Sequence, residues 1–312
     1  MPDYAVYGGL LRSTIPIPEL RPLPDGDSTR TPNWSFDVAS GEVPSMAQAA
    51  VVGQDEIFDQ IQATFFRGTN ALRLQFDDTG TFDLWDDARV IVWYPKDGCQ
   101  PDVARADLVG RVLPLAQHER GLIALHASAV CLPAGTIAFM APKNYGKSSL
   151  AMSLVTEHQA QLLTDDTLIV SPGRGVAVPG VHSVRLWGET ARRFEGLGRG
   201  RPVLSEKEIF EDLPQTSLAM QESPLVALYT IVPEEPQMTP VVRREALDGA
   251  HATIALIQYQ KLGALLGGPD AAQVFDRAAA LAARCPVYAL HIARDWARLP
   301  EAARVLADWH AR

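Results

Sequence analysis

Residues 141–148 of this 312-residue chain read APKNYGKS, and they directly follow an apolar run, TIAFM, at 136–140. A helical pattern of apolar residues extends from residue 148 to about residue 157. This order of strand, glycine-lysine loop and helix is typical of a loop whose backbone N–H groups wrap the phosphates of a nucleotide. We therefore expect Lys147 to neutralise the outer phosphates, Ser148 to offer its hydroxyl to magnesium, and Gly146 to let the backbone approach closely.

Several residues of the loop depart from the usual pattern. Ala141 stands where a first glycine is more common, and Pro142 has no backbone N–H to donate. Asn144 occupies a position that is often glycine, but asparagine tolerates a positive φ, so we expect the loop to close. Lys143 adds a positive charge that either faces a phosphate or is simply solvated. The predicted nucleotide-binding residues are Ala141, Lys143, Asn144, Tyr145, Gly146, Lys147, Ser148 and Ser149.

Two consecutive carboxylates, Asp165 and Asp166, begin 18 residues after Lys147 and directly follow a short apolar strand at 161–163. We expect the intervening helix to return the chain alongside the first strand, which would bring both carboxylates close to the phosphates. One would hold magnesium and the other would accept the proton of an attacking hydroxyl. The predicted metal ligands are Ser148 and Asp165, but the sequence does not decide which aspartate is the base. A solvated turn or a helix N-cap is the alternative.

Three segments together resemble the kinase domain of HPr kinase/phosphorylase and its relatives: LHASAV at 125–130, the loop continued by SL, and LTDD at 163–166. An isolated histidine is more often structural, but this resemblance implies that His126 lies close to the reacting groups. It implies an α/β fold with a P-loop domain, and magnesium with ATP or another nucleoside triphosphate as cofactors. It also implies that Asp165, Asp166 and His126 are catalytic residues. The glutamate- and glycine-containing signature of the bifunctional enzymes is absent, so phosphorolysis of a phosphoserine protein is not expected.

The N-terminal segments YAVYGGL at 4–10 and IPIPEL at 15–20 resemble a subgroup of these proteins that accompanies peptide-maturation systems. Members that act in lasso-peptide biosynthesis phosphorylate a serine near the C-terminus of the precursor. The resemblance therefore implies an ATP- and magnesium-dependent serine kinase whose partners are a nucleotide and a peptide or protein substrate. Two alternatives stay open: a regulatory or scaffold protein that binds nucleotide without catalysis, and a small-molecule kinase.

Basic residues after the acidic pair are candidates for contact with phosphate or substrate. Arg185, in VRLW at 184–187, could reach a phosphate or could have a structural role. A segment rich in arginine and glycine at 192–207 could bind an acidic substrate or its terminal carboxylate, or could be a solvated basic loop.

Composition restricts the compartment and the partners. The formal net charge is -9, which disfavours nonspecific binding of nucleic acid or anionic membranes. No apolar run reaches the roughly 18 residues of a membrane span, and the N-terminus lacks a secretion signal, so a cytoplasmic protein is expected. Three widely spaced cysteines do not suggest a disulfide framework or a zinc site. Homo-oligomerisation stays open.

The distribution of patterns predicts two domains: a smaller β-rich domain over 1–100 and the P-loop domain over 101–312. In the first we expect a strand at 4–11, a hairpin of 72–76 with 81–85, and a strand at 88–94. We expect helices and strands in the second as follows: helices at 102–117, 270–284 and 301–309, and further strands at 225–232 and 286–291.

Overall fold

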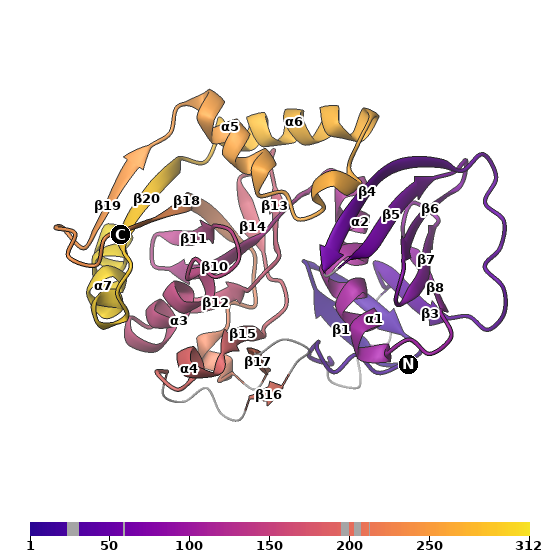
Figure 1. The fold of residues 1–312 in the computed structure, drawn as a ribbon, viewed down its shortest axis with the longest axis horizontal. Coiled ribbons are helices and arrows are strands. Elements are labelled where there is room, and N and C mark those ends of the chain that lie inside the picture. Colours follow the sequence, from indigo (N-terminus) through magenta and orange to yellow (C-terminus); the bar gives the residue numbers. More distant parts are fainter. Residues whose placement is uncertain (24–30, 59, 195–199, 203–206, 212) are drawn as a thin grey trace. The chain divides into compact units, whose positions relative to one another are not determined.

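The structure is a computed structural model, and it describes residues 1–23, 31–58, 60–194, 200–202, 207–211 and 213–312. Contacts divide the chain into two compact units (Figure 1). The first consists of Met1–Ala124 and Lys261–Asp276, and the second of Leu125–Gln260 and Arg277–Arg312. The predicted boundary after residue 100 differs from this division, because the helical segment 101–119 packs within the first unit.

Two hydrogen bonds show how this helical segment is held in the first unit. The Tyr7 hydroxyl donates to the carbonyl of Val109 at 2.9 Å, and the Gln117 side chain donates to the carbonyl of Tyr7. Leu108, Val109, Val112 and Leu113 are buried. The segment consists of α1 (Pro101–Asp107), a π-helical stretch (Leu108–Val112) and α2 (Leu113–Glu119).

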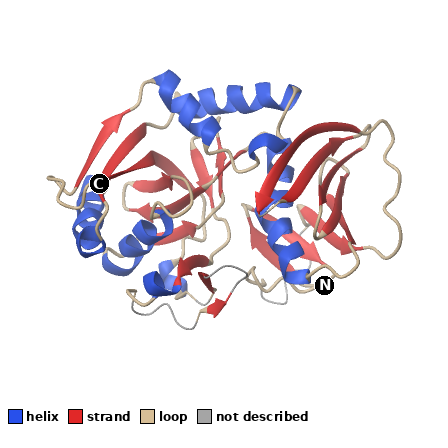
Figure 2. Ribbon diagram, viewed as in Figure 1, coloured by secondary structure: helices blue, strands red, loops and turns tan. Residues whose placement is uncertain are grey.

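The first unit is built on one eight-stranded sheet, and Figure 2 shows its strands in red. The pairs β2–β3 and β3–β8 are parallel, and the other neighbouring pairs are antiparallel. In spatial order the strands are β1 (Asp3–Val6), β2 (Gly9–Ser13), β3 (Trp34–Val38), β8 (Val90–Pro95), β7 (Gly80–Trp85), β6 (Ala71–Phe76), β5 (Ile61–Arg67) and β4 (Ala50–Phe58).

The predicted hairpin of 72–76 with 81–85 is confirmed as β6 and β7, with Leu72 opposite Leu84. The single strand predicted over 4–11 is wrong, because this segment is the hairpin of β1 and β2. Tyr7 and Gly8 have φ angles of 50° and 70°, and two consecutive positive φ angles make the two-residue turn that joins antiparallel strands.

The second unit holds the phosphate-loop pattern in its largest sheet. β10 lies between β12 and β11 and is antiparallel to both, whereas β18 and then β20 continue the sheet parallel to β11. β19 is antiparallel to β20, and the hairpin of β13 and β14 joins the start of β18. The strands within this unit are β10 (Ala127–Leu132), β11 (Gly135–Met140), β12 (Gln161–Thr164), β13 (Leu168–Ser171), β14 (Val176–Val178), β18 (Ser223–Glu234), β19 (Val242–Ala246) and β20 (Val287–Ala293). A short strand, β9 (Ile123–Leu125), spans the division between the two units.

The sequence predicted that the helix after the loop would return the chain to a position directly beside the loop strand, β11. This prediction is wrong, because one strand lies between them. β10 and β11 form a tight antiparallel hairpin, and β10 therefore occupies the position next to β11. β12 pairs with the far side of β10. Since both β11 and β12 are antiparallel to β10, their carboxyl ends still lie at the same edge of the sheet.

Within its described residues this region also has a smaller antiparallel sheet and five α-helices, of which α6 begins in the first unit. The small sheet has the order β15, β17, β16. Its strands are β15 (Val184–Trp187), β17 (Lys207–Phe210) and β16 (Arg201–Pro202), and the helices are α3 (Lys147–Glu157), α4 (Gly188–Ala191), α5 (Gly249–Gln258), α6 (Pro269–Ala282) and α7 (Leu299–Trp309). None of the helices within the described ranges has the length and apolar character that a membrane span requires.

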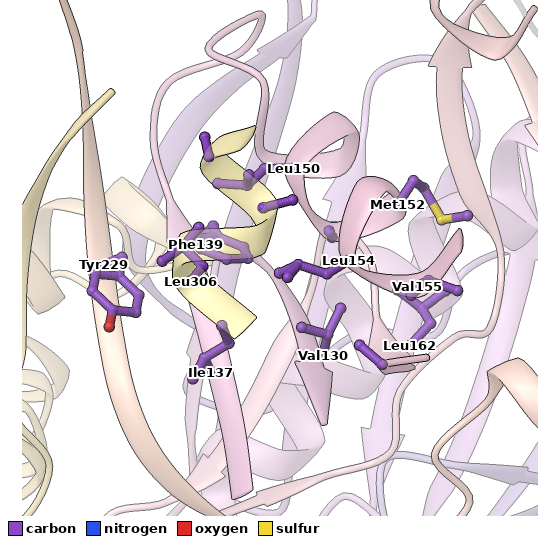
Figure 3. Close-up of a cluster of buried hydrophobic side chains, with 14 of the residues drawn as sticks. Val130, Ile137, Phe139, Leu150, Met152, Leu154, Val155, Leu162, Tyr229 and Leu306 are labelled. Carbon is purple, nitrogen blue, oxygen red and sulfur yellow. The ribbon is translucent and has the colours of Figure 1, made fainter. Parts of the chain in front are cut away.

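Helix α3 is held by an apolar core that it shares with the sheet and with α7 (Figure 3). Leu150 and Leu154 of α3 are almost completely buried, as are Phe139 of β11 and Leu306 of α7. Burial of such side chains stabilises the fold by roughly 1.5–3 kcal/mol each. The loop before α3 is therefore attached at both ends to well-packed elements.

Candidate functional site

The loop between β11 and α3 turns through two residues with left-handed backbone. Asn144 has φ of 70° and Gly146 has φ of 85°, so the prediction that asparagine allows the loop to close is confirmed. Among the described residues no side chain caps the N-terminus of α3. The first N–H groups of a helix have no partner inside the helix, and they attract anions. This loop therefore presents the backbone donors that a chain of phosphates requires.

The ammonium group of Lys147 lies inside the loop. It donates to the carbonyl of Ala141 at 2.7 Å and to that of Pro142 at 3.1 Å, and the residue is only 7% exposed. Lys143 is exposed on the outside of the loop, and Tyr145 is also exposed. Lys147 is thus the lysine that the loop itself surrounds.

The carboxylate of Asp165 accepts hydrogen bonds from three other segments. The Ser148 hydroxyl lies 2.9 Å from Oδ1 and 3.1 Å from Oδ2, the Ser128 hydroxyl donates to Oδ1, and the backbone N–H of Arg185 lies 3.4 Å from Oδ2. Asp165 is 7% exposed. These contacts place the carboxylate next to the first turn of α3.

Asp166 faces a different partner. Its backbone is left-handed, with φ of 75°, and its Oδ1 lies 3.2 Å from Nδ1 of His126. The same ring nitrogen lies 3.1 Å from the carbonyl oxygen of Asp166. The Asp166 side chain is 38% exposed and that of His126 is 24% exposed, so both reach solvent. Two adjacent carboxylates therefore have different surroundings, one buried among hydroxyl groups and one beside an imidazole.

The donor set around Asp165 fits a magnesium ion. Within the described part of the chain no basic side chain forms an ion pair with Asp165, and a buried carboxylate without a cation is energetically costly. Nowhere in the described ranges do three histidine, cysteine, aspartate or glutamate side chains gather as a metal site. Magnesium is commonly held by one or two carboxylates with substrate phosphates as further ligands, so Ser148 and Asp165 would suffice.

The basic candidates contribute less directly. Arg185 joins the site through its backbone N–H, and its side chain is exposed to solvent. In the arginine-rich segment, residues 195–199 and 203–206 lie outside the described residues. Arg192 donates to the carbonyl of Gly188 at 3.2 Å, and Arg201 pairs with Glu211 at 3.0 Å.

Two residues of the site had no role in the sequence prediction. Ser128 is completely buried and donates to Asp165, and the Trp187 indole N–H donates to the Asn144 side chain at 3.2 Å. Side chains two positions apart on a strand share a face. Ser128 lies two residues after His126, and Trp187 lies two residues after Arg185. This spacing could therefore have indicated that Ser128 and Trp187 belong to the site.

Comparisons with known proteins leave the family of this chain undecided. No protein-family model matches the sequence, and no match was found among curated proteins. The solved structure of the HPr(Ser) kinase/phosphatase from Coxiella burnetii aligns with 60% of this chain and 95% of its own, at 16% sequence identity and a TM-score of 0.32. A TM-score this low does not establish a shared fold, so the predicted membership and the lasso-peptide subgroup stay predictions.

Proposed function

We propose that this chain is an ATP- and Mg²⁺-dependent kinase that transfers the γ-phosphoryl group to a serine hydroxyl of a peptide or protein. The C-terminal serine of a lasso-peptide precursor is one such acceptor. The observation that carries the proposal is the pairing of Ser148 with Asp165 immediately beside the pairing of His126 with Asp166. A phosphate loop with both a metal-holding carboxylate and a second, solvent-accessible carboxylate has the parts that phosphoryl transfer requires.

Ser148 and Asp165 would hold magnesium between them. When bound there, Mg²⁺ would supply positive charge that stabilises the phosphate chain during transfer. Ser128 and the backbone N–H of Arg185 keep the Asp165 carboxylate in position, because each donates to one of its oxygens. Lys147 would exchange its loop carbonyl partners for phosphate oxygens, which are stronger acceptors for an ammonium group.

Asp166 would act as the general base. It takes the proton of the serine hydroxyl while the serine oxygen forms a bond to the γ-phosphorus and the bond from that phosphorus to the β–γ bridging oxygen breaks. The products are a phosphoserine and ADP. His126 holds the Asp166 carboxylate through Nδ1 and orients it towards the acceptor. His126 is therefore a positioning residue in this mechanism.

The test is phosphate transfer by the full chain. It would be incubated with ATP, Mg²⁺ and peptides encoded by neighbouring genes, and mass spectrometry would detect a phosphate-sized gain on a serine. Asp166→Asn is expected to lower the rate about 10²- to 10⁴-fold while ATP still binds, as for loss of a general base. Lys147→Ala should weaken ATP binding as well. The exposed Asp308→Asn, whose side chain is 68% exposed, is the matched control.

Three outcomes would contradict the proposal. Wild-type transfer by a variant with both Asp165→Asn and Asp166→Asn would remove the proposed roles of these carboxylates. ATP binding without transfer to any peptide or small alcohol would favour the nucleotide-binding regulatory protein. Transfer to a small-molecule alcohol but to no peptide would favour the small-molecule kinase.

A further inference from the structure

An open pocket of ≈ 270 Å³ lies beside the loop in the second unit. Asn144, Tyr145 and Ser149 line one side of it, and the carboxyl ends of β18 and β20 with the turn that follows line the other. β11, β18 and β20 are parallel neighbours, so their carboxyl ends meet at one edge, where ligands of α/β sheets bind. Its volume is slightly below the roughly 300–1,000 Å³ of pockets that hold a whole drug-sized ligand. It suits one part of a nucleotide.

The walls of the pocket are suited to a flat aromatic group. Most of its lining is apolar and includes Leu150, Ile231 and Ile292, whereas Arg294 and Asp295 add charged groups. Two aromatic residues at the rim are unusually open to solvent: Tyr145 is 44% exposed and Trp296 is 41% exposed. Aromatic rings that are exposed beside a pocket can stack on a ligand.

The indole of Trp296 has a partner within the chain, the guanidinium group of Arg193. The guanidinium carbon of Arg193 lies 5.4 Å from the centre of the indole ring. This cation lies over one face of the ring, so the opposite face is the one on which a ligand would stack. Trp296 follows Asp295, whose side chain accepts the backbone N–H of Ala297 at 2.9 Å and so fixes the turn.

The pocket lies at the nucleoside end of the proposed phosphate chain. Its lining, among the described residues, includes Ser149 and Leu150 but not Lys147, Ser148 or Asp165, which mark the metal and the outer phosphates. In a phosphate loop the lysine and the metal engage the β- and γ-phosphates. The opposite side of the same loop is therefore where the nucleoside emerges.

We propose that this pocket binds the purine base of the nucleotide by stacking on Trp296, with Tyr145 as the second aromatic wall. The inference rests on the proposed function, since it takes the loop as the phosphate site. An acceptor peptide is a poorer occupant, because its serine must approach Asp166, which does not line the pocket.

Calorimetric titration of the full chain in Mg²⁺ tests the proposal with ATP, GTP, CTP, UTP and inorganic tripolyphosphate. ATP and GTP should bind about tenfold or more tightly than tripolyphosphate and more tightly than CTP and UTP, as base stacking on an aromatic ring predicts. Trp296→Ala should remove most of the difference in affinity between the purine nucleotides and tripolyphosphate. The affinity for tripolyphosphate itself should stay within about twofold of the wild-type value. Trp296→Phe should restore part of that difference. Phe275→Ala, which removes a ring that is 55% exposed and outside the pocket, should change neither affinity.

The tripolyphosphate titration separates the failure of this inference from that of the proposed function. Two results would contradict the proposed base pocket but not the phosphate site: an unchanged ATP affinity in Trp296→Ala, or wild-type affinities that do not favour purine nucleotides. Loss of peptide binding with unchanged ATP affinity in Trp296→Ala would overturn the base pocket in favour of an acceptor site. Failure of the wild-type chain to bind either ATP or tripolyphosphate would overturn the nucleotide site itself.

Discussion

Three donors converge on the single carboxylate of Asp165, and each comes from a different segment of the chain. The Ser148 hydroxyl belongs to α3, the Ser128 hydroxyl to β10 and the Arg185 N–H to β15. A carboxylate held in this way cannot rotate without losing a hydrogen bond. Asp165 is the proposed metal ligand, and mutation of groups that hydrogen-bond to a metal ligand typically changes metal affinity or activity 10- to 100-fold.

Removing the Ser128 hydroxyl should therefore weaken magnesium use. In Ser128→Ala we expect the Mg²⁺ concentration for half-maximal transfer to rise about tenfold or more, because Asp165 loses a fixed donor. Ser153→Ala is the matched control, since Ser153 is equally buried but donates to Glu157 at 2.8 Å. Both variants should lose about 1 kcal/mol of unfolding free energy. A similar Mg²⁺ requirement in both would contradict the role of Ser128.

Among the larger elements, α7 and the central strand β18 are joined by a buried polar contact. Nε2 of His310, at the end of α7, lies 2.7 Å from the Tyr229 hydroxyl, which also accepts from Arg244 at 3.1 Å. The pKa of His310 is lowered from 6.5 to about 4, first by burial and then by the charge of Arg244. The histidine is thus neutral in the folded state throughout the physiological range.

This contact predicts that acid destabilises the fold through His310. Between pH 6.5 and about 4 the unfolded chain binds a proton at this histidine that the folded chain does not, so stability falls as the pH falls. The loss amounts to at most about 3 kcal/mol. Urea unfolding at pH 7 and pH 4.5 should show a smaller decrease for His310→Gln than for the wild type. An unchanged decrease in His310→Gln would refute the assignment.

At the scale of the whole molecule, the residues of the proposed nucleotide site all belong to the second unit. The loop, the acidic pair and the pocket fall within Leu125–Gln260 and Arg277–Arg312. A ligand that binds only the folded form stabilises what it binds by about 2.7 kcal/mol at a concentration of 100 Kd. The first unit contributes no described residue to this site.

Hydrogen exchange with and without ATP and Mg²⁺ should therefore separate the two units. We expect slower exchange in peptides from residues 136–166 and 287–299, where the loop, the acidic pair and the pocket lie. Peptides from β5 to β8 of the first unit should be unchanged, and they provide the control within the same sample. Equal protection in both regions would show that the ligand acts on more than the proposed site.

The sequence by itself determined the elements whose conformation depends on neighbouring residues. The glycine and asparagine of the loop predicted its closure, and the structure has positive φ at both. The hairpin of β6 and β7 and the helix over 102–117 also follow from local periodicity and turn residues. The hairpin at 3–13 was missed because Tyr7 is an uncommon residue at positive φ.

Only the tertiary structure decided which partner each carboxylate has. Ser128 and Asp165 are 37 residues apart, and Asn144 and Trp187 are 43 apart. Trp296 lines the same pocket as the loop residues Asn144 and Tyr145. These contacts depend on strand order, and the insertion of β10 between β11 and β12 cannot be read from local spacing. Asp165 and Asp166 are neighbours with the same chemistry, and they differ because the left-handed backbone of Asp166 turns its side chain towards His126.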